Sequence, residues 1–131
     1  MVNLQRYIKI LTRMFNLCYN FRFKTNSFMN LREIKEKEIF PGLKGKFVHG
    51  EKITWVFWDV KKDSIVPKHN HIHEQIMHVV TGKFEFVLNN DKKTYSDGDF
   101  VVIPSNVPHS GKALTDCKLM DVFSPVREEY K

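Results

Sequence analysis

The chain has 131 residues, a length typical of one domain, and its 42% hydrophobic and 13% aromatic content is sufficient for a folded core. The formal net charge is +6, but residues 1–28 contribute +5 of it and contain no acidic residue, so the rest of the chain is nearly neutral. This distribution lacks the basic face of a nucleic-acid-binding domain. No run approaches the ~18 consecutive apolar residues of a membrane-spanning helix.

Residues 1–28 form an extension that precedes the main domain, which we place at residues 29–131. Apolar residues recur in the extension at helical spacing, with basic residues elsewhere on the helical wheel. The apolar positions are Leu4, Ile8, Leu11, Phe15 and Cys18. We favour a helix that packs on the domain, or sequence upstream of a true start at Met29, over a targeting or membrane-surface helix. A secretory signal is disfavoured because the apolar run is interrupted.

The remaining chain shows short apolar segments separated by turn residues, which indicates an all-β domain. Residues 52–60 are apolar on both alternating faces, and this is typical of a strand in a sheet that is covered on both sides. Turns are expected at Pro41-Gly42, at Gly82 and at Asn89-Asn90-Asp91. We expect roughly eight strands in a jelly-roll barrel, including residues 43–49, 52–60, 75–81, 83–88, 92–95, 100–103 and 117–123.

Only two cysteines occur, and neither belongs to a C-x-x-C motif. We expect Cys117, in an apolar strand, to be a small buried residue. The sequence therefore predicts no disulfide framework, which is consistent with the cytoplasm.

One stretch concentrates most of the metal-ligand chemistry, and it reads PKHNHIHEQIMHVVTG from Pro67 to Gly82. His69 and His71 are two residues apart, so on an extended strand both side chains leave the same face. A second stretch, residues 98–109, supplies His109 after a strand and a proline-bounded turn. We expect these three imidazoles and one oxygen ligand to bind a divalent metal ion inside the barrel, with a coordination position open to substrate.

Strict alternation places both His73 and Gln75 on the face of His69, so either residue could complete the ligand set. A β-bulge would bring Glu74 to that position instead. His78 lies on the opposite face by alternation and is not expected to be a ligand.

The two stretches resemble the paired motifs of the cupin superfamily. The first motif, H-x-H-x3-E-x6-G, is matched by His69, His71, Gln75 and Gly82. The second, G-x5-P-x-G-x2-H-x3-N, is matched at Gly98, Pro104 and His109, with Asn106 and Ala113 at the remaining two positions. The resemblance implies a small jelly-roll barrel, with Gln75 as the fourth ligand in place of glutamate. A neutral amide would leave the site one charge more positive and favour an anionic substrate.

With its C-terminal stretch, the chain is similar to the small cupins of pectin and alginate breakdown that open unsaturated uronates. This resemblance implies conversion of 4,5-unsaturated uronate monosaccharides to linear keto-sugars, with Asp121, Phe123 and Arg127 beside the metal. Arg127 offers a planar fork that matches a carboxylate, Asp121 could transfer a proton, and Phe123 could form an apolar wall. Alternatively, Arg127 pairs with Glu128 or Glu129 at the surface, and Phe123 belongs to the core.

Two other functions fit the same residues. The protein could be an iron-dependent cupin oxygenase, or a non-catalytic cupin that binds a sugar or small acid. We expect a small anionic sugar as the ligand, no nucleic-acid or membrane partner, and a homodimer, because exposed edge strands of small barrels often pair.

Overall fold

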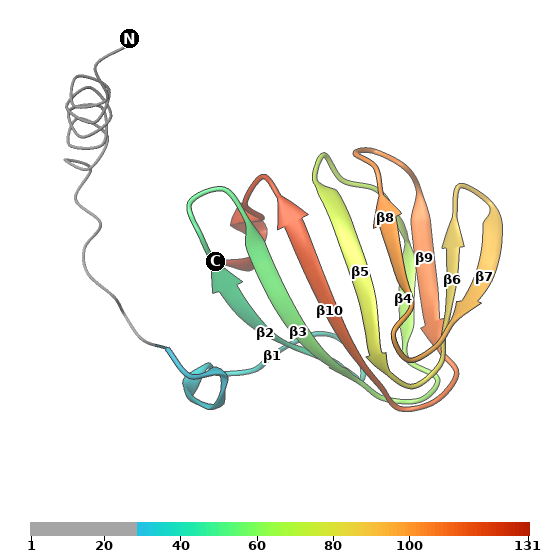
Figure 1. Cartoon of the computed structure of the whole chain (residues 1–131), viewed down its shortest axis with the longest axis horizontal. Coiled ribbons are helices and arrows are strands. Elements are labelled where there is room, and N and C mark those ends of the chain that lie inside the picture. The colour runs from blue at the N-terminus through green and yellow to red at the C-terminus, as the bar shows by residue number, and fades with distance from the viewer. Residues whose placement is uncertain (1–28) are drawn as a thin grey trace, which may run out of the picture.

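The computed structural model describes residues 29–131, so the predicted extension at residues 1–28 lies outside the described residues. The described chain is built almost entirely from antiparallel strands, with two short 3₁₀ helices near its ends (Figure 1). The elements are η1 (Leu31–Glu33), β1 (Lys37–Phe40), β2 (Leu43–His49), β3 (Thr54–Val60), β4 (Ile65–His69), β5 (Glu74–Thr81), β6 (Phe84–Leu88), β7 (Asp91–Tyr95), β8 (Phe100–Ile103), β9 (His109–Ala113), β10 (Cys117–Ser124) and η2 (Glu128–Tyr130).

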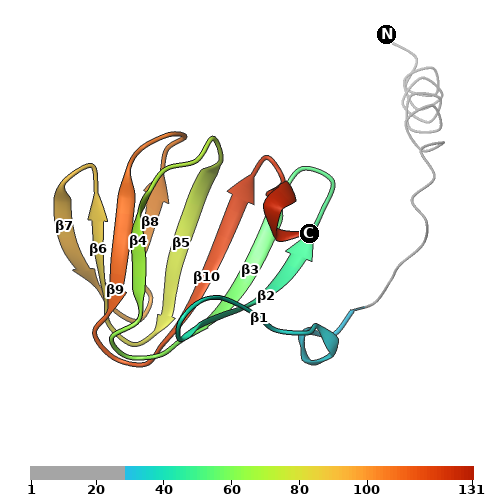
Figure 2. The ribbon, with the colours of Figure 1, turned by 180° about the vertical axis from the view of Figure 1, so that it is seen from behind.

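The strands form two sheets that face each other. A six-stranded sheet has the order β1-β2-β3-β10-β5-β8, and a four-stranded sheet has the order β4-β9-β6-β7. Figure 2, from the opposite side, shows β4 and β9 in front of β8 of the larger sheet, with β6 and β7 at the left of the view. The all-β jelly-roll prediction is confirmed.

Alternation along β3 explains how one strand contributes to the core. Val56, Trp58 and Val60 are buried, whereas Trp55 and Asp59 point outward and are exposed. Side chains of a strand alternate between the two faces of a sheet, so one face of β3 packs on the interior. Within residues 29–131, several apolar side chains on the outer face of this sheet, among them Trp55, Ile76 and Val102, are exposed.

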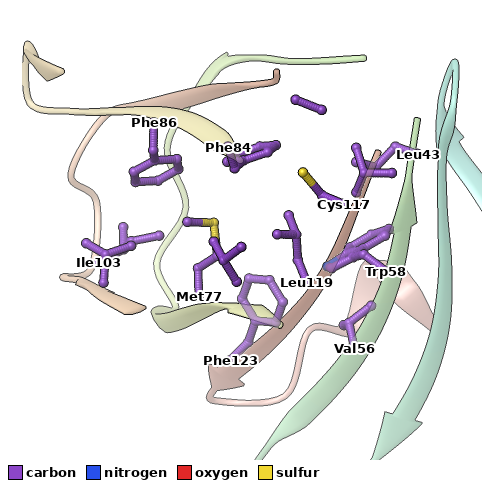
Figure 3. Packing of buried hydrophobic residues seen from close by; sticks show 14 residues of the cluster. Leu43, Val56, Trp58, Met77, Phe84, Phe86, Ile103, Cys117, Leu119 and Phe123 are labelled. Atoms are coloured by element: carbon purple, nitrogen blue, oxygen red, sulfur yellow. The ribbon is translucent and has the colours of Figure 1, made fainter. Parts of the chain in front are cut away.

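The core lies between the two sheets. Figure 3 shows Phe84 and Phe86 of β6 opposite Met77 of β5 and Leu119 and Phe123 of β10. Cys117 is also buried there, as predicted, with 3% of its surface exposed. Burying such side chains contributes about 1.5–3 kcal/mol for each large residue, so this cluster is the main source of stability.

The sequence analysis expected roughly eight strands and gave residue ranges for seven, whereas the described residues contain ten, so three were not located. The missed strands are β1, β4 and β9. Each contains proline, glycine, lysine or histidine in place of an apolar run. Their pairing with neighbouring strands outweighs these weak local preferences.

The strict alternation considered from His69 to Gln75 does not hold, because the chain is not a single strand there. β4 ends at His69 and pairs with β9 in the smaller sheet, whereas β5 begins at Glu74 and pairs with β10 and β8 in the larger sheet. The chain therefore crosses from one sheet to the other between residues 70 and 73. The rule that side chains alternate between the two faces of a strand therefore does not apply across residues 70–73.

Between residues 29 and 131, no helix has the length and apolar character needed to cross a membrane.

Gly111 provides a test of the packing between β9 and β6. A Cβ atom at this position would collide with the ring of the fully buried Phe84. Gly111→Ala should therefore lower the free energy of unfolding by about 1–3 kcal/mol, the usual cost of overpacking. Chemical denaturation measures this change. Ser110→Ala, on the opposite face of the same strand, is the control; equal stability of the two variants would contradict the packing described here.

Candidate metal centre

Three histidines meet at the end of the barrel where β4 and β8 end and β5 and β9 begin (Figure 1). His69 and His109 are directly opposed residues of the paired strands β4 and β9, with ring centroids 4.3 Å apart. His71 reaches the same point from the crossing segment, and its ring centroid lies 5.0 Å from that of His109. One ring nitrogen from each of the three lies within 4.8 Å of the others. This cluster could hold a metal ion.

Backbone carbonyls orient all three imidazoles. The Nδ1 atom of His69 lies 2.7 Å from the Pro67 carbonyl oxygen. Corresponding distances are 3.0 Å from His71 to the His73 carbonyl and 2.8 Å from His109 to the Val107 carbonyl. A carbonyl accepts only a donated hydrogen, so a neutral ring carries its proton on Nδ1 and leaves the Nε2 lone pair free. This is the arrangement that metal-binding histidines require.

The pKa of His71 also favours its neutral form. Burial, followed by the nearby Arg127 and His109, lowers the pKa of His71 to about 4. Burial likewise lowers the pKa of His109, against a smaller opposing effect of its bond to the Val107 carbonyl. Both rings therefore present lone pairs near neutral pH.

Gln75 lies beside this cluster, at the start of β5. Its Oε1 atom is 3.1 Å from His71 Nε2. With the His71 proton on Nδ1, two acceptor atoms face each other across this distance. A cation shared between them would satisfy both, so the donor set of three imidazoles and one amide oxygen fits a divalent metal.

The two alternative ligands lie elsewhere. His73 is buried, but its Nε2 atom approaches the Val126 carbonyl at 3.3 Å and its Nδ1 atom has no hydrogen-bond partner among the described residues. Glu74 is exposed and points away from the core. Neither residue joins the histidine cluster.

Asn106 explains why the second motif tolerates a departure from glycine. Its φ angle is +62°, a left-handed conformation that asparagine adopts more readily than most residues. The backbone N–H of Asn106 donates to the His71 carbonyl at 2.7 Å. The β8–β9 connection and the crossing segment are therefore joined directly beside the cluster.

A cavity connects the histidines with the residues expected to act on substrate. Its lining includes His69, His109 and Gln75 together with Asp121 and Arg127. Asp121 and Phe123 both point inward from β10, as the sequence analysis considered. Phe123 serves as a cavity wall and as part of the core at once.

Comparison with known proteins decides the family. A family model described as a cupin domain matches residues 56–123, just over half of the chain. The chain is a cupin.

Individual relatives show which cupins this chain resembles. Pectin degradation protein KdgF of Dickeya dadantii (strain 3937) is 31% identical over 97 residues, which cover 72% of this cupin and 88% of that protein. The structure of KdgF from Halomonas sp. is 32% identical with a TM-score of 0.76, covering 82% of this cupin and 100% of that chain. An RmlC-like cupin from Shewanella frigidimarina NCIMB 400 is 27% identical with the same TM-score of 0.76, covering 82% and 97%. The predicted resemblance to cupins of pectin breakdown is confirmed.

Asp121 of this cupin is a buried carboxyl group with an unusual environment. Trp58 Nε1 donates to its Oδ2 atom at 2.8 Å, whereas Oδ1 has no partner in the described part of the chain. Burial raises the pKa of Asp121 to about 6, against the opposing effects of Gln75, Trp58 and Arg127. The group can therefore hold or release a proton close to neutral pH.

Arg127 lies between two aromatic rings. Its guanidinium carbon is 4.8 Å from the centroid of Phe123 and 4.3 Å from that of Tyr130. Its Nε and Nη2 atoms donate to one oxygen of Glu129, at 2.8 and 2.7 Å. The pairing with Glu129 that the sequence analysis considered is therefore present, but on an arginine that is only 9% exposed and lines the cavity.

Two residues that position the site were missed by the sequence analysis. Trp58 holds Asp121, and Tyr130 covers Arg127 from the C-terminal segment. The inward position of Trp58 follows from alternation along β3, which could have identified it as facing the interior. The location of Tyr130 depends on how the chain folds back after β10, and no local pattern predicts it.

The pKa of Asp121 predicts how stability depends on pH in protein freed of metal. Between pH 4 and 6 the folded state keeps this proton whereas the unfolded state loses it, so this carboxyl makes the wild type less stable as pH rises. At pH 8, Asp121→Asn should therefore increase the free energy of unfolding by up to about 3 kcal/mol. The advantage should vanish below pH 4.

Urea denaturation at several pH values measures this difference. Asp59→Asn, at an exposed position on β3, is the matched control and should change stability little. An Asp121→Asn advantage that stays constant from pH 4 to 8 would show that the carboxyl does not titrate in this range.

Proposed function

We propose that this cupin is a metal-dependent enzyme that opens 4,5-unsaturated uronate monosaccharides and converts them to linear keto-sugars. The observation that carries the proposal is a single cavity that joins two imidazoles of the three-histidine cluster, those of His69 and His109, to a buried carboxyl group and a buried guanidinium group. Similarity to two KdgF proteins, one of them named for pectin degradation, supports the choice of substrate class.

His69, His71, His109 and Gln75 would hold the metal. A bound divalent ion would act as a Lewis acid that polarises the substrate carboxylate and a neighbouring sugar oxygen. The neutral amide of Gln75 adds no negative charge, so the site retains a stronger attraction for an anion.

The reaction rearranges bonds without gaining or losing atoms. The bond between C1 and the ring oxygen breaks, the C1 hydroxyl loses its proton to form an aldehyde, and an enol remains at C5. The enol then loses its O–H proton while C4 gains one, which produces the ketone. No oxidant is consumed, in contrast to the alternative of a cupin oxygenase.

Asp121 is suited to the proton transfer in this reaction. Its pKa of about 6 is close to neutral pH, where a general acid or base works best. The Trp58 indole fixes one carboxyl oxygen at 2.8 Å, which leaves the other free to exchange a proton. Asp121 would then deliver the proton that C4 receives.

Arg127 would bind the substrate carboxylate, and Phe123 would contact the sugar. The fork of Arg127 already donates from Nε and Nη2 to Glu129, whereas Nη1 has no partner within residues 29–131. A substrate carboxylate would take this free edge or displace Glu129. Stacking between Phe123 and Tyr130 keeps the guanidinium plane in place for that contact.

The first test is turnover of an unsaturated uronate without oxygen. The purified protein should remove the ultraviolet absorbance of the C4–C5 double bond under anaerobic conditions. A chelator should abolish the activity, and adding back a divalent metal should restore it. Elemental analysis before and after chelation measures the metal directly. Bound uronate without turnover would favour the sugar-binding alternative, and a requirement for oxygen would favour the oxygenase.

The second test separates substrate capture from metal binding. Arg127→Ala should reduce kcat/KM on the order of 30-fold or more, because a buried charge partner of a carboxylate is worth at least about 2 kcal/mol. Metal content should stay unchanged, since Arg127 is not part of the ligand set. Arg127→Lys keeps the charge without the fork and should recover only part of the loss.

Arg32→Ala, on the exposed η1, is the matched control for this variant and should behave as wild type. Loss of metal from Arg127→Ala would contradict the division of roles proposed here.

A further inference from the structure

Arg127 and Glu129 form an ion pair across the boundary between the cavity of the site and the surface of the protein. Arg127 lines the cavity, whereas Glu129 lines an open groove beside it, together with Lys52 and Ile72. The side chain of Arg127 is 10% exposed and that of Glu129 is 50% exposed. One partner is therefore enclosed by the protein, and the other can turn toward solvent.

The position of Arg127 is fixed by contacts that do not involve Glu129. Its guanidinium group lies between the rings of Phe123 and Tyr130, at 4.8 and 4.3 Å from their centroids. Its backbone N–H donates to Oγ1 of the buried Thr54 at 2.9 Å. If the side chain of Glu129 turned into the groove, the guanidinium group would therefore remain at the cavity.

Glu129 contacts Arg127 as the carboxylate of a ligand would. Its Oε1 atom accepts from both Nε and Nη2 of Arg127, at 2.8 and 2.7 Å. Partial burial alone would raise the pKa of Glu129, but the bond from its own backbone N–H and the contacts with Arg127 lower the pKa overall. Glu129 is therefore ionised at neutral pH, and it uses two of the three guanidinium nitrogens that recognise a carboxylate.

We propose that Glu129 is an internal competitor for the carboxylate of a bound uronate and thereby sets the affinity of the site. In the absence of ligand Glu129 pairs with Arg127, and an entering uronate carboxylate displaces it into the groove. The inference rests on the proposed function for the identity of the ligand, and on the ion pair for the competition itself.

Displacement explains how the protein accommodates Arg127 both with and without ligand. A buried guanidinium group that lacks a partner is costly. The carboxylate of the ligand satisfies Arg127 while it is bound, and Glu129 satisfies it again when the ligand leaves. Substrate and product carry the same carboxylate, so the competition weakens the binding of both. Affinity that all states of a ligand share does not accelerate the chemical step, and weaker binding favours product release.

The strength of the ion pair gives the expected size of the effect. An internal partner lowers the apparent affinity of a ligand in proportion to the fraction of molecules in which it occupies the site. For an ion pair with one half-exposed partner, this factor is about fivefold.

Isothermal titration calorimetry of the full chain with galacturonate tests the proposal. Galacturonate has the carboxylate but lacks the C4–C5 double bond, so it cannot undergo the proposed reaction and its binding is measured without turnover. Glu129→Gln removes the charge, preserves the size of the side chain, and should tighten the binding of galacturonate about fivefold. The KM for an unsaturated uronate should fall by a similar factor.

Glu128→Gln is the matched control. Glu128 is the preceding residue of η2, and it pairs with Lys131 at 2.8 Å instead of with Arg127. Both substitutions change the net charge by the same amount, so any gain from the overall charge of the protein would occur in both. Glu128→Gln should therefore bind galacturonate with an affinity close to that of the wild type.

Unchanged or weaker binding by folded Glu129→Gln protein would overturn the proposal, as would an equal gain in Glu128→Gln. Circular dichroism establishes that each variant is folded. Glu129→Ala also removes the carboxylate and should tighten binding, so it replaces Glu129→Gln if that variant does not fold.

The two proposals fail in different ways. If unsaturated uronate is not turned over but galacturonate binds with the pattern described here, the proposed function is wrong and the competition by Glu129 is supported. If neither the wild type nor Glu129→Gln binds galacturonate, the competition is refuted.

Discussion

Three hydrogen bonds from imidazole Nδ1 atoms to backbone carbonyls determine what the rest of this site can do. Each bond fixes both the orientation and the protonated nitrogen of one histidine, so that three lone pairs face a common point. The carbonyls belong to residues close in sequence to each histidine, and the barrel brings these local units together. His69 and His109 meet because β4 pairs with β9, and His71 joins them because the chain must cross between sheets at that position.

Charge inside the barrel imposes the second constraint. A buried carboxyl group and a buried guanidinium group are both costly unless neighbouring groups compensate them. Trp58 provides the hydrogen bond for Asp121, and Phe123, Tyr130 and Glu129 surround Arg127. Asp121 remains only partly satisfied, and its raised pKa is the direct result. The negative charge of Asp121 is only partly compensated by hydrogen bonds, which lowers the stability of the fold. The same property raises its pKa toward neutral pH, where a carboxyl group can transfer a proton.

The fold was most predictable from the amino-acid sequence where one local rule sufficed. Period-2 alternation correctly identified the strands around Trp58, Gln75 and Phe123, and the spacing of the two motifs identified the histidines that meet. Alternation failed between His69 and Gln75, because a change of sheet depends on pairing partners that lie far away in sequence. For the same reason, no local pattern could exclude His73, which is two residues from both His71 and Gln75 but points toward Val126. The roles proposed for Asp121 and Arg127 came from family resemblance, whereas their burial required the folded chain.

The position of β10 has a consequence for folding. The last strand of the described chain occupies an interior place in the larger sheet, where it pairs with β3 on one side and β5 on the other. Val122 is thus a partner of Trp55, a residue far earlier in the chain. Until β10 arrives, β3 and β5 each present an unpaired edge, and the large sheet cannot close around its core. Such distant pairings slow the search for the native state, so assembly of this barrel should proceed late and cooperatively, and not hairpin by hairpin.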